Sequence, residues 1–243
     1  MISFAQKLFI LHVTIDGQLS CDDHITDIVR ACNYHIRALR HICPLIKRDT
    51  ANTVACSMVF SILDYCNVIL YDFSDQNISR LQRVQNSLAR VVCQAPYRSS
   101  ATHMPRVLHW LPVRQRIECN LASLTFKVRL HHEPIYLSEL VVDHVPTRSM
   151  CSSDKVLPVV PRMKTVTASR AFRVAALKTW NSLPLEIRSI TFTRTFHQRL
   201  KHICSTVHII NWSGNGASVA VPGRMLDFLK CTYLGRRLTI NFD

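Results

Sequence analysis

Two adjacent carboxylates, Asp22 and Asp23, are of the residue type that holds divalent ions in phosphoryl-transfer enzymes. They follow Ser20 and Cys21, and a Ser-x-x-Asp pattern is typical of a helix start. Carboxylates in a first helical turn favour the helix dipole and accept hydrogen bonds from free backbone N–H groups. We therefore interpret the pair as a helix start, and the sequence predicts no catalytic residue.

Cysteine and histidine are frequent, with 10 and 12 residues, but their spacing indicates no metal site. The sequence has no C-x-x-C pair and no H-E-x-x-H motif, so the usual zinc-binding patterns are missing. Cys21, Cys32 and Cys43 recur along one helical face, which favours buried thiols. We expect no metal and no cofactor. Without a recognisable signal peptide, we expect reduced thiols in an intracellular protein, either cytoplasmic or nuclear.

Basic residues are the strongest candidates for binding. Lys and Arg total 30 against 16 acidic residues, a net charge of +14, which favours polyanionic partners. Arginine suits phosphate because its forked guanidinium donates two hydrogen bonds at once. The arginines expected to contact a nucleic-acid backbone are Arg30, Arg37, Arg80, Arg83, Arg90, Arg114 and Arg116. A solvated helical face is the alternative interpretation of the same spacing.

The first half of the chain has the pattern of a strand followed by helices. Residues 8–16 carry β-branched side chains and end at Gly17, which predicts one strand. A helix then runs from Ser20 to Pro44, with apolar residues three and four positions apart. A second helix is predicted from Asp49 or Thr50 to about Tyr71, and a third begins at a Ser74 cap.

The second half continues as helices joined by proline-marked breaks. Helices are predicted after Pro112, over 170–180 and over 194–204, with a short helical turn at 134–141. Four of the five glycines lie in the last 30 residues, which sets residues 206–243 apart as a poorly ordered tail. Within that tail, Val207–Asn211 has the composition of a short strand. The fold class expected is mainly α.

Two apolar features have a structural and a functional interpretation. Val54 to Tyr71 is 18 residues long, but Asp64 and Asn67 near its middle are costly in lipid. A buried helix is favoured there, and no membrane span is expected. Trp110 can stack on a base or anchor a helix end in a core, and the second is the more common use of such a residue.

Five blocks of sequence, in this order, carry a family resemblance. They are LHVTIDGQL (11–19), SILDYCNVILY (61–71), LQRVQNSLARVV (81–92), LHWLPVRQRI (108–117) and AFRVAALKTWNSLPLEIR (171–188), and FHQRLK (196–201) closes the pattern. Together they resemble the segment after the catalytic palm in reverse transcriptases of non-LTR, LINE-type retrotransposons of the jockey-like kind. The resemblance covers about Leu11 to Cys204.

The resemblance implies a division of the chain. Residues 1–19 would be a palm-end strand of primer-grip type, and residues 20–100 a thumb-like helical bundle. Residues 101–205 would be a basic post-thumb helical region, and residues 206–243 a tail outside the resemblance. The chain departs from the family at His12, where glycine is usual. It also lacks the palm hairpin with an aromatic-x-Asp-Asp pattern, because only about ten residues precede the first block.

The expected function is therefore a reverse-transcriptase fragment without catalysis of its own, which binds an RNA or DNA backbone of template–primer type without sequence preference. No small-molecule substrate and no membrane partner is expected. One alternative is a helical protein-interaction module that uses the exposed surface that would face the palm. The other is a translated transposon fossil without a selected function.

Overall fold

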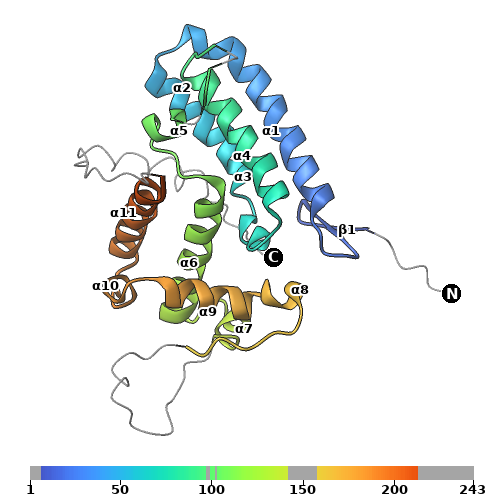
Figure 1. The fold of residues 1–243 in the computed structure, drawn as a ribbon, viewed down its shortest axis with the longest axis vertical. Coiled ribbons are helices and arrows are strands. Elements are labelled where there is room, and N and C mark those ends of the chain that lie inside the picture. Colours follow the sequence, from blue (N-terminus) through green and yellow to red (C-terminus); the bar gives the residue numbers. More distant parts are fainter. Residues whose placement is uncertain (1–6, 97–98, 102, 142–157, 213–243) are drawn as a thin grey trace, which may run out of the picture. The chain divides into compact units, whose positions relative to one another are not determined.

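The computed structural model describes residues 7–96, 99–101, 103–141 and 158–212, with side chains described as far as Cys204. The described chain is mainly helical, as the sequence predicted (Figure 1). It divides into two compact units, one of residues 7–66 and 73–113 and the other of residues 67–72 and 114–212. The division at Val113 lies later in the chain than the boundary expected after residue 100. The expected tail beyond Trp212 lies outside the described residues.

The first unit consists of a hairpin and a set of helices. Its elements are β1 (Lys7–Ile10), β2 (Val13–Asp16), α1 (Asp22–Ile42), α2 (Arg48–Ala55), a π-helical turn (Cys56–Phe60), α3 (Ser61–Leu63), α4 (Asp75–Val92) and α5 (Met104–Val107). The second unit has its own helices. They are a 3₁₀ turn (Asn67–Leu70), α6 (Val113–His131, whose first residue belongs to the first unit), α7 (Ile135–Ser138), α8 (Val166–Ser169), α9 (Phe172–Ser182), α10 (Leu185–Arg188) and α11 (Thr193–Trp212).

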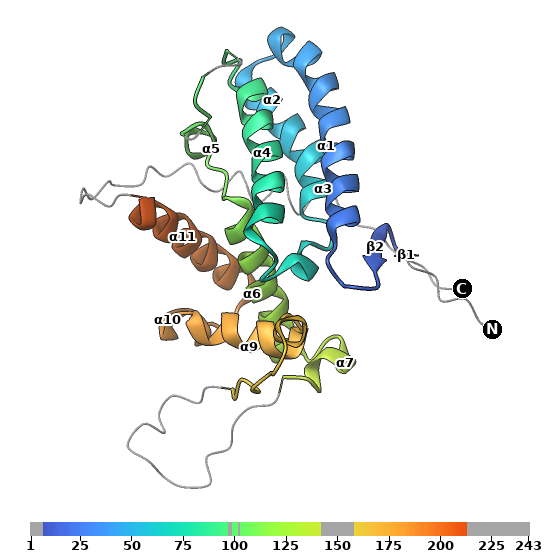
Figure 2. The same ribbon diagram turned by 45° about the vertical axis from the view of Figure 1, so that its right-hand side comes forward.

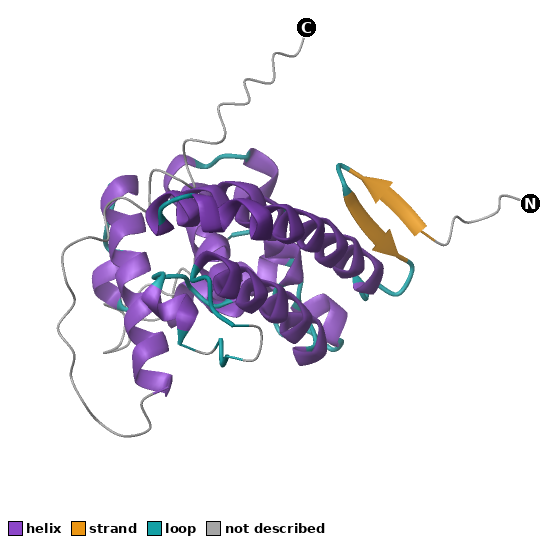
Figure 3. Ribbon diagram, turned by 90° about the horizontal axis from the view of Figure 1, so that it is seen from above, coloured by secondary structure: helices purple, strands orange, loops and turns teal. Residues whose placement is uncertain are grey.

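The single strand expected over residues 8–16 is a two-stranded antiparallel hairpin (Figure 3). Ile10 pairs with Val13, so only Leu11 and His12 form the turn. Both have positive φ, 46° and 62°, as a type I′ turn requires. This turn could not be predicted, because Asn and Gly, its usual residues, are absent there. Tyr65 Oη donates to the Leu11 carbonyl at 2.9 Å and fixes the turn to the helices.

Helix α1 begins at Asp22 with both predicted carboxylates in its first turn. The capping differs from the prediction, because Cys21 with φ 54° is the N-cap and makes no side-chain cap hydrogen bond. The Ser20 hydroxyl instead donates a hydrogen bond to Asp16 Oδ2 at 2.7 Å, which joins Ser20 to the last residue of β2. The helix ends at Ile42, two residues before Pro44, as predicted. The three cysteines expected in the core, Cys21, Cys32 and Cys43, are all buried.

The second predicted helix is shorter than expected. Its regular part ends at Leu63 after the π-helical turn, and Cys66 with φ 52° reverses the chain direction. Asn67 then accepts a hydrogen bond from Asn120 Nδ2 at 3.0 Å inside the second unit. Apolar content alone predicted a continuous helix, but the polar Asn67 finds its partner outside it. Within the described residues, no helix is both long enough and apolar enough to cross a membrane.

Helix α4 confirms its prediction. Ser74 is the N-cap and its side chain accepts from Asn77 N. The predicted apolar stripe of Ile78, Leu81, Val84, Leu88 and Val91 is buried. Gln85, which has no exposed surface, was missed. Its Nε2 donates to the Leu111 carbonyl at 2.8 Å, so a buried amide ties α4 to the segment before α6.

Trp110 lies in the core of the first unit. It is 2% exposed, and its ring meets Phe60 edge-on with 4.7 Å between the centroids. The indole Nε1 donates to Asn52 Oδ1 at 3.0 Å. The π-helical turn, which ends at Phe60, presents this ring to the indole. Of the two interpretations given for Trp110, the anchoring one is therefore confirmed.

The second unit is built around aromatic packing. Phe126 stacks on Phe196 with 4.0 Å between ring centroids, and Trp180 lies 6.0 Å from Phe196. The Arg129 guanidinium lies 5.2 Å from the centroid of the Trp180 ring. Helix α11 continues to Trp212, so the strand predicted at Val207–Asn211 is wrong. Its β-branched residues favoured a strand, but the helix begun at Thr193 runs through them.

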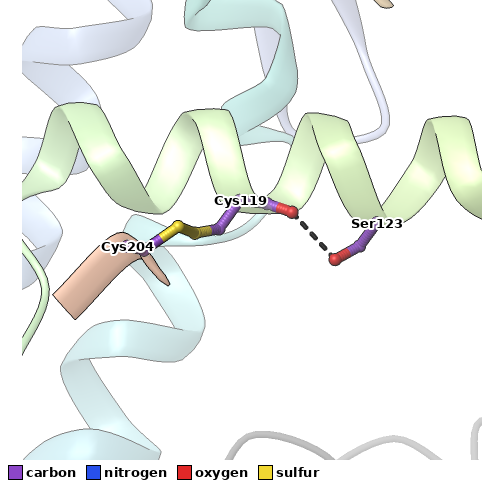
Figure 4. Close-up of a disulfide and its surroundings, with 3 residues drawn as sticks. All are labelled: Cys119, Ser123 and Cys204. Atoms are coloured by element: carbon purple, nitrogen blue, oxygen red, sulfur yellow. Dashed lines mark hydrogen bonds between the residues drawn. A yellow bond between two sulfur atoms is a disulfide. The ribbon is translucent and has the colours of Figure 1, made fainter. Parts of the chain in front are cut away.

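A disulfide joins Cys119 of α6 to Cys204 of α11 within the second unit (Figure 4). The figure also shows Ser123, whose hydroxyl donates to the Cys119 carbonyl at 2.8 Å. The sequence predicted reduced thiols throughout, and this pair departs from that prediction. The other cysteines described, Cys21, Cys32, Cys43, Cys56, Cys66 and Cys93, form no disulfide. Spacing did not indicate the pair, because its members are 85 residues apart.

Left-handed backbone occurs at nine described residues, and each of them carries a side chain. They are Leu11, His12, Leu19, Cys21, Cys66, Asp72, Gln94, His109 and His132. Gly17 is the only glycine among the described residues. Glycine is the residue that adopts this conformation most readily, so the chain turns at these points without its usual means.

Candidate nucleic-acid interface

Helices α1 and α4 lie side by side and run parallel, as Figures 1 and 2 show. Near their N-termini, Asn77 Nδ2 donates to Asp22 Oδ1 at 2.6 Å. At the opposite ends, Gln94 Nε2 donates to the Cys43 carbonyl at 2.9 Å. Because both ends are joined, the two helices pack against each other along their whole length.

Charge is segregated along this helix pair. The acidic residues Asp22, Asp23, Asp27 and Asp75 all lie at its N-terminal end. Residues 28–48 contain five basic and no acidic residues, and residues 76–96 contain three basic and no acidic residues. Helix dipoles favour this distribution, by about 0.3–1 kcal/mol for each exposed charge near an end. The C-terminal end of the pair is therefore strongly positive.

Five of the predicted arginines lie on this pair, and the three exposed ones are differently engaged. Arg37 and Arg83 are exposed, and Arg83 donates its Nε only to the Ser79 carbonyl of its own helix, at 3.3 Å. Arg30 is exposed but forms an ion pair with Asp27 at 3.2 Å. Arg37 and Arg83 are thus the better placed to meet a phosphate.

Arg80 and Arg90 are half-buried. Arg80 donates to Thr26 Oγ1 at 2.7 Å, so it links α4 to α1. Arg90 donates its Nε to the Ser99 carbonyl at 3.2 Å. Because the three nitrogens of the guanidinium are coplanar, the terminal nitrogens of Arg90 point away from the Ser99 carbonyl that its Nε contacts. Among the arginines predicted on α4, Arg80 therefore has a structural role, because its hydrogen bond to Thr26 joins α4 to α1.

Arg40 was missed as a site residue. It is exposed in the last turn of α1, and together with Arg90 it lines a cavity between the ends of the two helices. The spacing of Arg37 and Arg40, three residues apart, was the signal that could have included it. Arg114 is exposed and Arg116 half-buried, and both belong to α6 of the second unit. They form a separate candidate set.

The carboxylate pair has partners within the fold. Asp23 forms an ion pair with Lys7 at 2.8 Å, and Asp22 accepts the hydrogen bond from Asn77. Within the described ranges, no group of three or more His, Cys, Asp or Glu side chains is placed to hold a metal ion. The two carboxylates thus tie α1 to the hairpin and to α4.

Burial shifts the pKa of several groups. It lowers the pKa of His24, whose Nε2 has no hydrogen-bond partner among the described residues, although the nearby Asp27 opposes the shift. Burial likewise lowers the pKa of His197, with help from Lys127 and Lys201. Burial raises the pKa of Cys32 to about 12. Burial therefore favours the uncharged form of each of these three groups.

No family model, curated protein or solved structure matches this chain. The candidate interface is therefore defined by its own geometry: two parallel helices side by side, acidic at one end and basic at the other. The charge of the basic end is of the sign that suits a polyanion.

Proposed function

We propose that this chain is a nucleic-acid-binding module that contacts the phosphate backbone of a duplex through the basic end of the α1–α4 pair. The observation that carries the proposal is the absence of any acidic residue from 28–48 and 76–96, the two segments that the parallel packing brings together. A phosphate approaching this end meets arginines from both helices, and the next acidic residue in the sequence, Asp49, lies beyond α1 in the first turn of α2. Arginine also donates to two phosphate oxygens at once.

The spacing along α4 suits a backbone. Arg83 and Arg90 are seven residues apart, which corresponds to about 10 Å along a helix axis. Each nucleotide step of a B-form strand advances by about 3.4 Å, so the two arginines span about three steps. Arg37 lies on α1 beside this stretch. We therefore expect this surface to contact only a few phosphates of the backbone.

The proposed origin is a reverse transcriptase of a non-LTR, LINE-type retrotransposon, from the part that follows the palm. The ordered sequence blocks between Leu11 and Cys204 support this origin. The turn geometry adds to it, since His12 has φ 62° at the position where those enzymes usually have glycine. The packing of α1 against α4 also suits a thumb, which grips a template–primer duplex.

Salt titration tests the proposed function. Binding of a fluorescent RNA–DNA duplex is measured at several salt concentrations for the wild type and for the triple variant Arg37→Gln, Arg83→Gln, Arg90→Gln. Neutralising one phosphate contributes about 0.9 to the slope of log K against log salt, so losing three contacts should lower the slope by about 2.7. The affinity should depend little on base sequence.

A matched control separates this surface from general charge. Arg173→Gln, Lys178→Gln and Arg194→Gln remove the same three charges from exposed positions on α9 and α11. If the control lowers the slope as much as the triple variant does, the contacts are not on the α1–α4 pair. Absence of binding to any duplex at low salt would overturn the proposal and leave two alternatives, the protein-interaction module and the transposon fossil.

We also propose that the chain alone extends no primer. Asp22 and Asp23 are held by Asn77 and Lys7, and their positions in the first turn of α1 suit a helix start. Primer extension with Mg²⁺ and with Mn²⁺ is the measurement. Template-dependent extension that disappears in the variant Asp22→Ala, Asp23→Ala would contradict this proposal.

A second candidate function is protein interaction, and the hairpin favours it. Leu8, Phe9, Ile10 and Leu11 are 52%, 68%, 46% and 76% exposed, so a row of apolar side chains follows β1 and alternates between its two faces. Among the described residues, only β2 pairs with β1. Such a row is typical of a surface that another protein covers. Sedimentation of the wild type and of Phe9→Lys tests it: if neither chain associates with itself or with an added candidate protein, this function is excluded.

A further inference from the structure

A cavity of about 350 Å³ lies between the C-terminal ends of α1 and α4. Arg40 of α1 and Ser87, Arg90 and Gln94 of the α4 segment form its polar lining. Pro44 and Val91 contribute apolar surface. The volume falls within the range of small-molecule pockets, about 300–1,000 Å³. Because residues 28–48 and 76–96 contain no acidic residue, the only charges in its lining are the two guanidinium groups.

The two arginines approach the cavity from different helices. The Nε of Arg90 donates to the Ser99 carbonyl at 3.2 Å, which fixes the plane of the group. Arg40 is exposed and makes no hydrogen bond or ion pair with any residue in the described part of the chain. Two guanidinium groups with unoccupied donors that line one hollow are suited to an anion with several oxygens.

The helix ends do not cancel this charge. Each C-terminus carries about half a negative charge, so the two together contribute about one. Gln94 already donates to the Cys43 carbonyl, one of the end groups that carries this partial charge. Arg48 donates to Cys93 Sγ at 3.2 Å, which places a third guanidinium at the end of α4. Three positive charges thus face about one negative charge, and the region stays positive.

We infer that this cavity binds the phosphate of a nucleotide through Arg40 and Arg90. The Ser87 hydroxyl already donates to the Arg83 carbonyl at 2.9 Å, so the two guanidinium groups supply the donors to the anion. The apolar surface of Pro44 and Val91 packs against the sugar or base. The phosphate is a monoester, because its extra negative charge rewards two arginines more than a diester does. The ligand is thus a nucleoside monophosphate unit.

Such a unit has two sources, a free mononucleotide and the phosphorylated end of a nucleic-acid strand. In the second case the inference rests on the proposed function, because the strand must bind the neighbouring surface. In the first case it stands alone. The chemistry recognised is the same in both, so the test uses one probe for each source.

Isothermal titration calorimetry of the full chain with adenosine 5′-monophosphate, and with adenosine as the uncharged match, is the first measurement. The nucleotide should bind and the nucleoside should not. Arg40→Gln and Arg90→Gln should each weaken binding by roughly tenfold or more, since each removes charge-assisted hydrogen bonds. Arg173→Gln is the matched control, because it removes the same charge from an exposed position on α9 outside the cavity. Far-UV circular dichroism checks that each variant is folded, and Arg90→Lys should recover part of the affinity.

The second measurement compares oligonucleotides with a 5′-phosphate and with a 5′-hydroxyl. A preference for the phosphate that Arg40→Gln abolishes would assign the site to strand ends, and nucleotide binding without this preference would assign it to free nucleotides. No nucleotide binding at low salt, or equal loss in Arg173→Gln and Arg90→Gln, would overturn the inference. Duplex binding that persists in that case leaves the proposed function intact, and nucleotide binding without duplex binding would overturn only the proposed function.

Discussion

Trp110 offers the sharpest test of how the first unit is held together. Its indole is 2% exposed, meets Phe60 edge-on and donates to Asn52 Oδ1 at 3.0 Å. Trp110→Ala would remove the whole ring and should lower the free energy of unfolding by about 3–5 kcal/mol. That change is large enough to unfold a marginal chain, so a smaller perturbation is more informative.

Trp110→Phe retains an aromatic ring near Phe60 but removes the N–H donor. The lost hydrogen bond should contribute about 0.5–1.5 kcal/mol, and the smaller ring adds a cavity cost. Asn52→Ala removes the acceptor and leaves a buried indole N–H without a partner, which should cost about 1–3 kcal/mol. Since both changes break the same bond, the double variant should be about 0.5–1.5 kcal/mol more stable than the sum of the single effects predicts.

Urea denaturation followed by far-UV circular dichroism measures all four chains of this cycle. Asn86→Ala on α4 is a control for loss of an amide elsewhere in the unit, and it should show no coupling with Trp110→Phe. A coupling energy indistinguishable from zero would refute the hydrogen bond. A Trp110→Phe variant that keeps its stability but loses affinity for nucleic acid would instead mean that this ring stacks on a base.

Three further predictions concern other parts of the chain. Burial lowers the pKa of His24 below its value in the unfolded chain. The free energy of unfolding should therefore fall as the pH drops below about 6.5, because the unfolded state takes up the proton more readily. The melting temperature should depend less on pH in the variant His24→Gln. Iodoacetamide should alkylate the exposed Cys66 of the native chain first and reach Cys32, whose pKa is about 12, only after denaturation; equal rates by mass spectrometry would contradict this. Leu11→Asn with His12→Gly should stabilise the hairpin by about 1 kcal/mol, seen as roughly fivefold slower amide exchange in β1 and β2, and unchanged exchange would mean that the turn is unstrained.

The periodic parts of the fold could be predicted from the sequence. The stripe from Ile78 to Val91 and the Ser74 cap are local signals, and α4 forms as those signals predict. The hairpin could not be predicted, because a turn at Leu11 and His12 uses residues that rarely turn. The end of the second helix could not be predicted either, because it depends on the hydrogen bond between Asn67 and Asn120, which are far apart in the sequence.

The candidate site was only partly visible in the sequence. Helical spacing grouped Arg83 with Arg90, and grouped Arg30 with Arg37, but spacing cannot tell which arginine is already engaged. Arg80 donates to Thr26 of the neighbouring helix, a contact that depends on how α4 packs against α1. The meeting of Arg40 with Arg90 depends on the same packing, so no single-helix pattern could have grouped them.

The nine left-handed residues that carry side chains have a practical consequence for work on this protein. Each such position lowers the free energy of unfolding by roughly 1 kcal/mol. Glycine would recover part of this free energy, although its larger conformational entropy in the unfolded chain opposes the gain. Effects at well-separated positions add almost independently. Glycine at several exposed left-handed positions, such as Leu19, Cys66 and His132, would therefore give a more stable parent protein. Arginine variants made in that protein would stay folded, so their binding affinities could be compared.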